Sequence, residues 1–346
     1  MDSEVWELEN AEVDIFPHLW LSYNDLSPPL RQCFSYCAIF PKDHLMEKRK
    51  LIELWMAHGY IKETTKKDME TIGEEYFQNL ASRSFFQDIN IDDNFYDISY
   101  TCKMHDIVHD FAQYIRRDEC FSMEVSSSVE SSMESVSNEA RYSRIVLAGK
   151  GSLPGYFYDA KKLRGLIAQF EGGFVVTAVL SSFFNELTCL RSLDLSNRHI
   201  EEIPPTISQL IHLRQLDLSS NDHLKSLPET LCELYNLQTL NVYGCRNLAK
   251  LPDGVRKLVN LRHLHIVGKW AKSPWSIKAI ASSCANPSLP LCYILHCVIL
   301  ESWFQPENII LISFGILVGR AKILERQPLI LVDMSVRHDL DAETYS

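Results

Sequence analysis

The stretch that decides the fold reads LRSLDLSNRHIEEIPPTI at residues 190–207 and recurs as LRQLDLSSNDHLKSLPETL at 213–231. A third copy, LQTLNVYGCRNLAKLPDGV, occupies 237–255, and a fourth opens with LRHLHI at 261–266. The copies start 23, 24 and 24 residues apart, and three of them share a later Leu-Pro or Ile-Pro step. A fixed period of this length predicts stacked structural repeats.

The LxxLxL spacing is typical of a leucine-rich repeat, in which alternate apolar residues of a short strand point into a continuous core. Asn221 and Cys245 occupy the position after each strand where a polar side chain satisfies buried backbone groups. We expect Asn197 to do the same in the repeat that is one residue shorter. Two weaker units, at 142–147 and 163–166, are expected to precede these repeats.

The residues between the apolar positions form columns about 4.8 Å apart on the concave surface. One column is Ser192, Gln215, Thr239 and His263. We expect this surface to bind a protein, and the candidate partner-binding residues are Arg191, Asp194, Arg214, Asp217, Gln238, Asn241, Arg262 and His265.

The first 120 residues have a different pattern. Five helices are expected. The first covers 15–23, and the second begins at Pro28 and is stopped by Pro41. The third covers 51–58 and is ended by Gly59, and the last two cover 69–80 and 104–115. Between the last two, residues 84–89 and 95–100 flank a polar turn at 90–94 and predict a β-hairpin. Several helices with a hairpin predict a winged-helix domain.

Three motifs in this block carry a family resemblance: LWLSYNDLSPPLRQCFSYCAIFPKD (19–43), LIELWMAHGYI (51–61) and CKMHDIVHDFA (102–112). They resemble the winged-helix part of plant NLR immune receptors, best the coiled-coil (non-TIR) class. In that family a leucine-rich repeat follows this domain directly. The resemblance covers about residues 5–268 and implies an intracellular receptor acting in plant defence.

The resemblance also implies a nucleotide sensor at Met104, His105 and Asp106, where the family's histidine contacts the β-phosphate of bound ADP. An imidazole at a helix start is chemically suited to phosphate because the helix N-terminus is positive. The alternative is that His105 only caps the helix or packs. The partners implied are a pathogen effector, a guarded host protein or the receptor's own nucleotide-binding domain.

The sequence contains no GxxxxGK[ST] phosphate-binding loop, and the nearest text, 149–151, lacks the leading glycine and the Ser/Thr. We therefore expect a chain that begins inside a larger receptor, binds no ADP or ATP by itself and is not an enzyme. ADP or ATP is implied for the complete receptor alone. A truncated adaptor or decoy that regulates full receptors is the alternative function.

Two further alternatives come from other classes. His105 and His109 are four apart in HDIVH, superficially like a zinc hydrolase, but Asp replaces the usual Glu and no third ligand follows. The 48–50 cluster, Lys-Arg-Lys, suggests DNA contact, but residues 1–120 hold 12 Lys and Arg against 23 Asp and Glu. That negative charge argues against binding nucleic acid. No catalytic or metal site is predicted.

The overall composition and the absence of a recognisable targeting signal in this sequence predict a cytoplasmic protein. Hydrophobic residues make up 46% of the chain, the N-terminus is acidic and unlike a signal peptide, and no apolar stretch is long enough to span a membrane. The ten cysteines show no CxxC pair and are expected to be reduced. The predicted class is α+β, with a winged-helix domain at 1–120, a Ser/Glu-rich linker at 121–139, a leucine-rich-repeat solenoid at 140–268 and an atypical apolar tail at 269–346.

Overall fold

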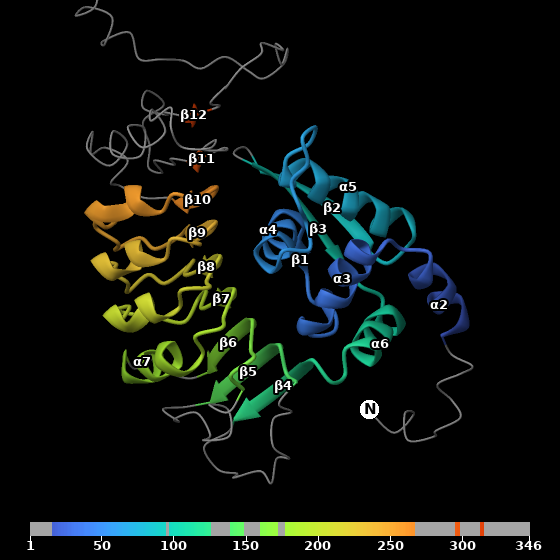
Figure 1. Ribbon diagram of the computed structural model, residues 1–346, viewed down its shortest axis with the longest axis horizontal. Coiled ribbons are helices and arrows are strands. Elements are labelled where there is room, and N and C mark those ends of the chain that lie inside the picture. Colours follow the sequence, from blue (N-terminus) through green and yellow to red (C-terminus); the bar gives the residue numbers. More distant parts are fainter. Residues whose placement is uncertain are drawn as a thin grey trace, which may run out of the picture.

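The computed structural model describes residues 16–94, 97–125, 139–148, 160–171 and 177–266, with two short strands, β11 (Leu295–Cys297) and β12 (Ile312–Phe314). These residues form a helical unit and a curved solenoid that face each other (Figure 1). The predicted α+β class, a winged-helix domain followed by a leucine-rich-repeat solenoid, is confirmed. The predicted tail at 269–346 lies outside the described residues apart from β11 and β12. Among the residues described, no helix combines the length and apolarity needed to cross a membrane.

The helical unit contains a small sheet in the order β1-β3-β2. Its elements are α2 (Pro17–Asn24), α3 (Pro28–Tyr36), the 3-10 turn η2 (Cys37–Ile39), β1 (Met46–Glu47), α4 (Lys48–His58), α5 (Met69–Ser82), β2 (Gln87–Asn94), β3 (Asp97–Lys103) and α6 (Asp106–Ile115).

The helices form where the sequence carries start and stop signals. Pro28 opens α3 at a position where a missing backbone donor costs nothing. Asp68 caps α5 by accepting a hydrogen bond from the Thr71 amide at 2.8 Å. Gly59 ends α4 in the left-handed region, with φ of 77°.

The hairpin forms, but the predicted turn at 90–94 is wrong. These residues belong to β2, which pairs with β3 as far as Asn94 opposite Asp97. β2 lies at the edge of the sheet, and Ile89 and Ile91 are exposed. An edge strand whose side chains face solvent does not need alternating apolar residues. The polar residues 90–94 can therefore extend β2 where the sequence predicted a turn.

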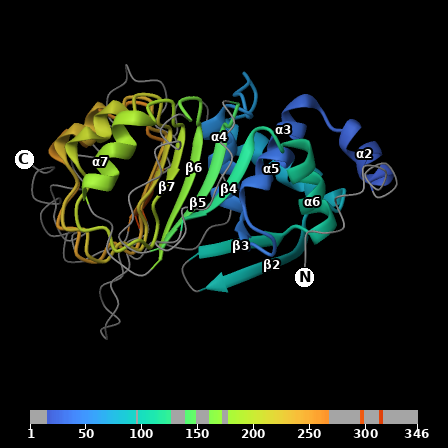
Figure 2. The same ribbon diagram turned by 90° about the horizontal axis from the view of Figure 1, so that it is seen from below.

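The solenoid sheet is parallel and has the order β10-β9-β8-β7-β6-β5-β4. Its strands are β4 (Cys120–Val125), β5 (Tyr142–Ala148), β6 (Gly165–Glu171), β7 (Ser192–Asp194), β8 (Gln215–Asp217), β9 (Thr239–Val242) and β10 (His263–Ile266). The outer side carries α7 (Thr177–Glu186) and the 3-10 helices η4 (Pro205–Gln209), η5 (Glu229–Glu233) and η6 (Asp253–Lys257) (Figure 2). Both weaker repeat units are rungs of this sheet.

The sheet begins earlier than the sequence indicates. β4 lies at the start of the predicted linker, 121–139, and pairs with β5 from Cys120 opposite Tyr142 to Val125 opposite Leu147. Phe121 packs against the repeat core, because FSMEV has apolar residues at alternate positions. Residues 126–138, the rest of the predicted linker, lie outside the described residues.

Asn221 binds backbone groups inside the solenoid as predicted. Its Nδ2 donates to the carbonyls of Leu195 and Leu218 at 2.9 and 2.7 Å, and its Oδ1 accepts from the amides of Arg198 and Ile200 at 3.0 Å each. The side chain is fully buried. One residue therefore satisfies four backbone groups that the apolar core cannot.

The prediction for Asn197 is wrong. Asn197 is exposed, with φ of 56°, and its neighbour Arg198 donates from Nε to the Ala168 carbonyl at 2.9 Å instead. The shorter repeat shifts the chain by one residue, so the inward position falls on Arg198. Cys245 takes the equivalent place in the rung after Asn221, with Sγ 3.1 Å from the Leu218 carbonyl.

We predict that Asn221→Ala lowers the free energy of unfolding by about 3 kcal/mol, because it leaves several buried backbone groups without partners. Asn197→Gly is the matched control, and we expect no loss because glycine accepts its positive φ. Urea denaturation followed by circular dichroism measures both. Equal losses for the two variants would contradict this assignment of the buried asparagine.

Candidate functional site

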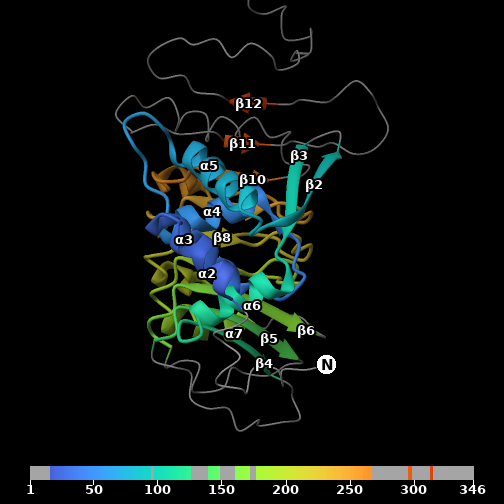
Figure 3. The same cartoon turned by 90° about the vertical axis from the view of Figure 1, so that its right-hand side faces the viewer.

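The concave face of the solenoid is covered by the helical unit, chiefly by α4 (Figure 3). Contacts run from α4 and α5 to β7, β8 and β10, and we call this set of interactions the concave contact. Ser192, Gln215, Thr239 and His263, one predicted outward column, are all buried beneath it. The surface predicted to meet a partner is therefore occupied by the same chain.

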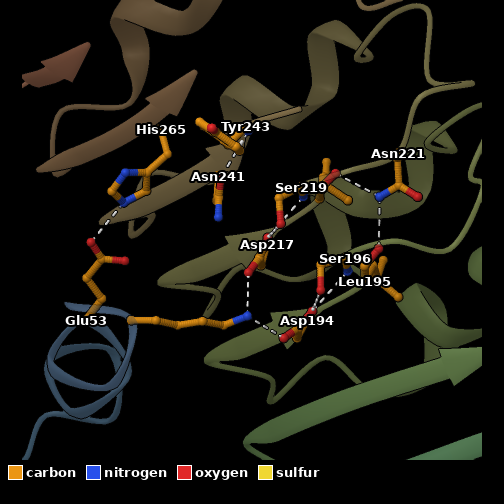
Figure 4. Close-up of polar contacts among 12 residues, drawn as sticks. Glu53, Asp194, Leu195, Ser196, Asp217, Ser219, Asn221, Asn241, Tyr243 and His265 are labelled. Atoms are coloured by element: carbon orange, nitrogen blue, oxygen red, sulfur yellow. Dashed lines mark hydrogen bonds and ion pairs between the residues drawn. The ribbon is translucent and has the colours of Figure 1, made fainter. Parts of the chain in front are cut away.

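Lys50 joins α4 to two rungs at once. Its Nζ lies 2.8 Å from Asp194 Oδ2 and 2.7 Å from Asp217 Oδ2, and the Asp217 side chain is 2% exposed. Burial alone raises the pKa of Asp194, but the Lys50 ammonium outweighs it and holds that pKa below its usual value. Both aspartates are oriented by the serine two residues on, since Ser196 and Ser219 each donate from amide and hydroxyl (Figure 4).

A second pair lies one helical turn further along α4. Glu53 is buried, and its Oε1 is 2.8 Å from Nε2 of His265 on β10 (Figure 4). Burial raises the pKa of Glu53, but the neighbouring His265 and His263 outweigh it and lower that pKa. A buried carboxylate without such a partner would be strongly destabilising, so Glu53 depends on the solenoid.

The first turn of α5 makes the third group of contacts. Arg262 donates from Nε and Nη2 to the two carboxylate oxygens of Glu70, each at 2.9 Å, a bidentate pair. His263 Nε2 lies 3.2 Å from the same carboxylate. Burial raises the pKa of Glu70, but these hydrogen bonds outweigh it and lower the pKa to about 2.

The C-terminal end of α4 meets arginines. Arg191 Nη1 donates to the His58 carbonyl at 3.0 Å, and Arg214 Nη1 lies 3.5 Å from the Ala57 carbonyl. Cations are favourable there because the last carbonyls of a helix are unpaired and its C-terminus is negative. The buried His58 ring also bonds Ser192 Oγ at 2.9 Å.

Six of the eight predicted partner-binding residues thus contact the helical unit, whereas Gln238 and Asn241 make no such contact within the described ranges. Asn241 Oδ1 accepts from the Tyr243 amide at 3.0 Å, and Gln238 Oε1 is buried without a hydrogen bond from any described residue. Sequence reasoning missed the residues on the other side: Lys50, Glu53, His58 and Glu70. The motif at 51–61 and the cluster at 48–50 include three of these residues but give no sign of this contact, because the fold brings them to the solenoid.

The predicted sensor triplet lies away from the concave contact, at the start of α6. Met104 is buried, whereas His105 and Asp106 are exposed. His105 caps α6, its Nδ1 accepting from the Ile107 amide at 3.3 Å. Because Nδ1 accepts this bond, Nε2 is the nitrogen that carries the proton in the neutral ring. Nε2 is therefore able to donate a hydrogen bond to an anionic oxygen beside the helix N-terminus.

The structure gives the zinc and DNA alternatives no support. His109 is buried and its Nε2 lies 2.7 Å from the Phe40 carbonyl, while His105 is exposed, and no metal-binding cluster of His, Cys, Asp or Glu occurs among the described residues. In the 48–50 cluster, Lys48 pairs with Glu74 at 2.9 Å, and Lys50 is bound to the solenoid.

Both units match known families. Residues 39–112 match the model described as "Disease resistance protein Winged helix domain", and residues 175–282 match "Leucine-rich repeat region". The two matched regions follow each other in the order that the structure shows.

Curated relatives match over about three fifths of the chain. The putative disease resistance protein RGA1 of Solanum bulbocastanum is 36% identical over 225 residues, 63% of this chain and 19% of that protein. Disease resistance protein RGA2 of the same species is 37% identical over 61% of this chain and 18% of that protein. The putative disease resistance RPP13-like protein 1 of Arabidopsis thaliana is 36% identical over 63% and 20%. The chain thus spans about a fifth of the length of these relatives.

We predict that Lys50→Met loosens the concave contact, because it leaves two carboxylates side by side without their cation. Backbone amides of β7 and β8 are expected to exchange hydrogen about tenfold faster, equivalent to about 1.4 kcal/mol. Hydrogen–deuterium exchange by mass spectrometry measures this. Lys67→Met, which removes a lysine from an exposed pair with Glu75, is the control, and unchanged exchange in Lys50→Met would refute the prediction.

Proposed function

We propose that this chain, which is of the plant NLR type in its winged-helix and leucine-rich-repeat domains, acts in plant defence as part of an intracellular immune receptor. Its motifs favour the coiled-coil class. In the resting state, the solenoid holds the winged-helix domain through the concave contact. Activation separates the two and exposes the concave surface.

The observation that carries this proposal is the polar character of the concave contact. Its bonds are ion pairs and hydrogen bonds between side chains such as Lys50, Glu53 and Glu70 and the strand residues opposite. Charged groups of this kind are readily hydrated once separated, whereas a continuous apolar interface would bind permanently. Each unit has a largely separate apolar core, with Tyr142 of β5 buried in the core of the helical unit, so the two can part with most of each core intact.

The same concave residues serve recognition in this proposal. A protein partner, either a pathogen effector or a guarded host protein, would compete with α4 and α5 for Asp194, Asp217, Arg262 and His265. Such competition couples recognition to release, since a ligand shifts a two-state equilibrium by its preference for one state. The receptor's own nucleotide-binding domain is the third partner in the proposal, on the side of α6.

A nucleotide fits the sensor position chemically. Bound ADP would place its phosphate charge near His105, whose cap bond to the Ile107 amide orients the ring and whose Nε2 is the donor nitrogen in the neutral ring. The α6 N-terminus adds a favourable dipole. We therefore propose that His105 senses ADP in the complete receptor, with Met104 anchoring the loop and Asp106 in the first helical turn.

The charge pair between Glu70 and Arg262 offers a direct test. Glu70→Arg and Arg262→Glu each place like charges together, so each is expected to raise defence output without a pathogen signal, several-fold over the unmodified receptor. The reversed pair in the double variant restores attraction and should return output toward baseline. Ion leakage from leaves expressing a full-length receptor with this segment measures it.

Glu75→Arg is the control, because it makes the same charge change on an exposed part of α5, where it disrupts an exposed pair with Lys67 and leaves the concave contact in place. The proposed resting contact fails if the single variants stay silent, or if the double variant is as active as either single one.

The sensor role is tested at His105 with two replacements. His105→Asn removes the imidazole but preserves the cap, because asparagine is a preferred N-cap residue, whereas His105→Ala removes both. If His105 senses ADP, both variants weaken the off state to a similar extent, and only when a nucleotide-binding domain is present. If only the alanine variant has an effect, the residue acts as a cap and not as a sensor.

A further inference from the structure

One column of the concave sheet consists almost entirely of arginines. In successive rungs, the residue just before the strand is Arg141, Arg164, Arg191, Arg214, Gln238 and Arg262, and each backbone amide donates to the carbonyl of the one before. Neighbouring rungs are about 4.8 Å apart. Positive side chains are therefore stacked at that interval along one edge of the concave contact.

Carboxylates neutralise the two ends of this column but not its middle. Arg141 lies 3.3 Å from Glu119, and Arg262 is bidentate on Glu70. Between them, the side-chain hydrogen bonds that Arg191 and Arg214 make to described residues go to the carbonyls that end α4. Arg164 has no side-chain hydrogen bond or ion pair within the part of the chain described.

The groups beside the middle of the column do not neutralise its positive charge. His58 is buried at the middle of the column, and its Nδ1 has no hydrogen-bond partner among the residues that the structure describes. Burial lowers the pKa of His58, and the nearby Arg191, Arg116, Arg164 and Arg214 lower it further. Burial and the neighbouring arginines also lower the pKa of Arg191. In a chain with a net charge of −11, this concentration of arginines is an exception.

We propose that Arg164, Arg191 and Arg214 form a binding site for an oligophosphate anion at the edge of the concave contact. All three side chains are half-buried, so a ligand reaches them from solvent. The guanidinium fork matches phosphate oxygens, two bonds at a time. The anion would offset the repulsion between stacked arginines and tie the solenoid to the end of α4.

The spacing favours phosphate over an acidic peptide. Carboxylates on one face of an extended peptide recur every second residue, about 6.6 Å apart, which does not match rungs about 4.8 Å apart. Adjacent phosphoryl groups share a bridging oxygen and present their charges closer together. A short chain of them can contact three successive arginines. This site goes beyond the proposed receptor role, because it requires only the folded chain.

Titration calorimetry of the intact chain with sodium tripolyphosphate at low salt tests the proposal. We expect saturable binding with one ligand per chain. Arg164→Gln should weaken tripolyphosphate binding at least tenfold. Glutamine is compatible with the fold at this position because Gln238 occupies the same column. Arg246→Gln is the matched control: it removes the same charge from a solenoid side chain that is 83% exposed, and affinity should stay within twofold.

Two further measurements distinguish this site from the sensor position and from a general affinity for polyanions. His105→Asn should leave tripolyphosphate binding unchanged, because His105 lies outside the arginine column. Hexaglutamate should bind at least tenfold more weakly than tripolyphosphate. The proposal is overturned by an absence of saturable binding, by equal weakening in Arg164→Gln and Arg246→Gln, by loss in His105→Asn, or by tighter binding of hexaglutamate.

Discussion

The bridge from Lys50 to Asp194 and Asp217 is the interaction on which the arrangement of the two units depends. The two aspartates hold the same position in neighbouring repeats, so the rung spacing of about 4.8 Å places them side by side. Two carboxylates that are largely removed from solvent at that distance repel each other and need a shared cation. Lys50 supplies it from α4, and this fixes the helix across the concave face.

The direction of α4 follows from this first bond. Lys50, near its N-terminus, meets the ends of β7 and β8, whereas His58, at its C-terminus, meets Ser192 at the start of β7. The helix therefore runs opposite to the strands, and its negative end comes to the arginine column. The remaining contacts at β10 hold α5 beside it, and Tyr142 of β5 packs against Tyr36 and His58 in the core of the helical unit.

Local patterns made much of this fold predictable, and long-range contacts account for what was not. Repeat period and capping residues such as Gly59 located the strands and helices, and Asn221 was recognised from its place after LxxLxL. Asn197 was misassigned because a one-residue deletion leaves the inward position ambiguous until the backbone is seen. The concave side chains were identified as a surface, but that α4 covers them follows from tertiary packing that no local pattern encodes.

The most direct test of this account is a double-mutant cycle on Glu53 and His265, which belong to different units and meet only if the solenoid holds α4. Unfolding free energies of the intact chain are measured for Glu53→Gln, His265→Gln and both together at pH 7. The account predicts a coupling energy of at least about 1 kcal/mol, as found for residues in one buried network. Additive losses, with coupling indistinguishable from zero, would show that α4 and β10 do not touch and would contradict the resting contact.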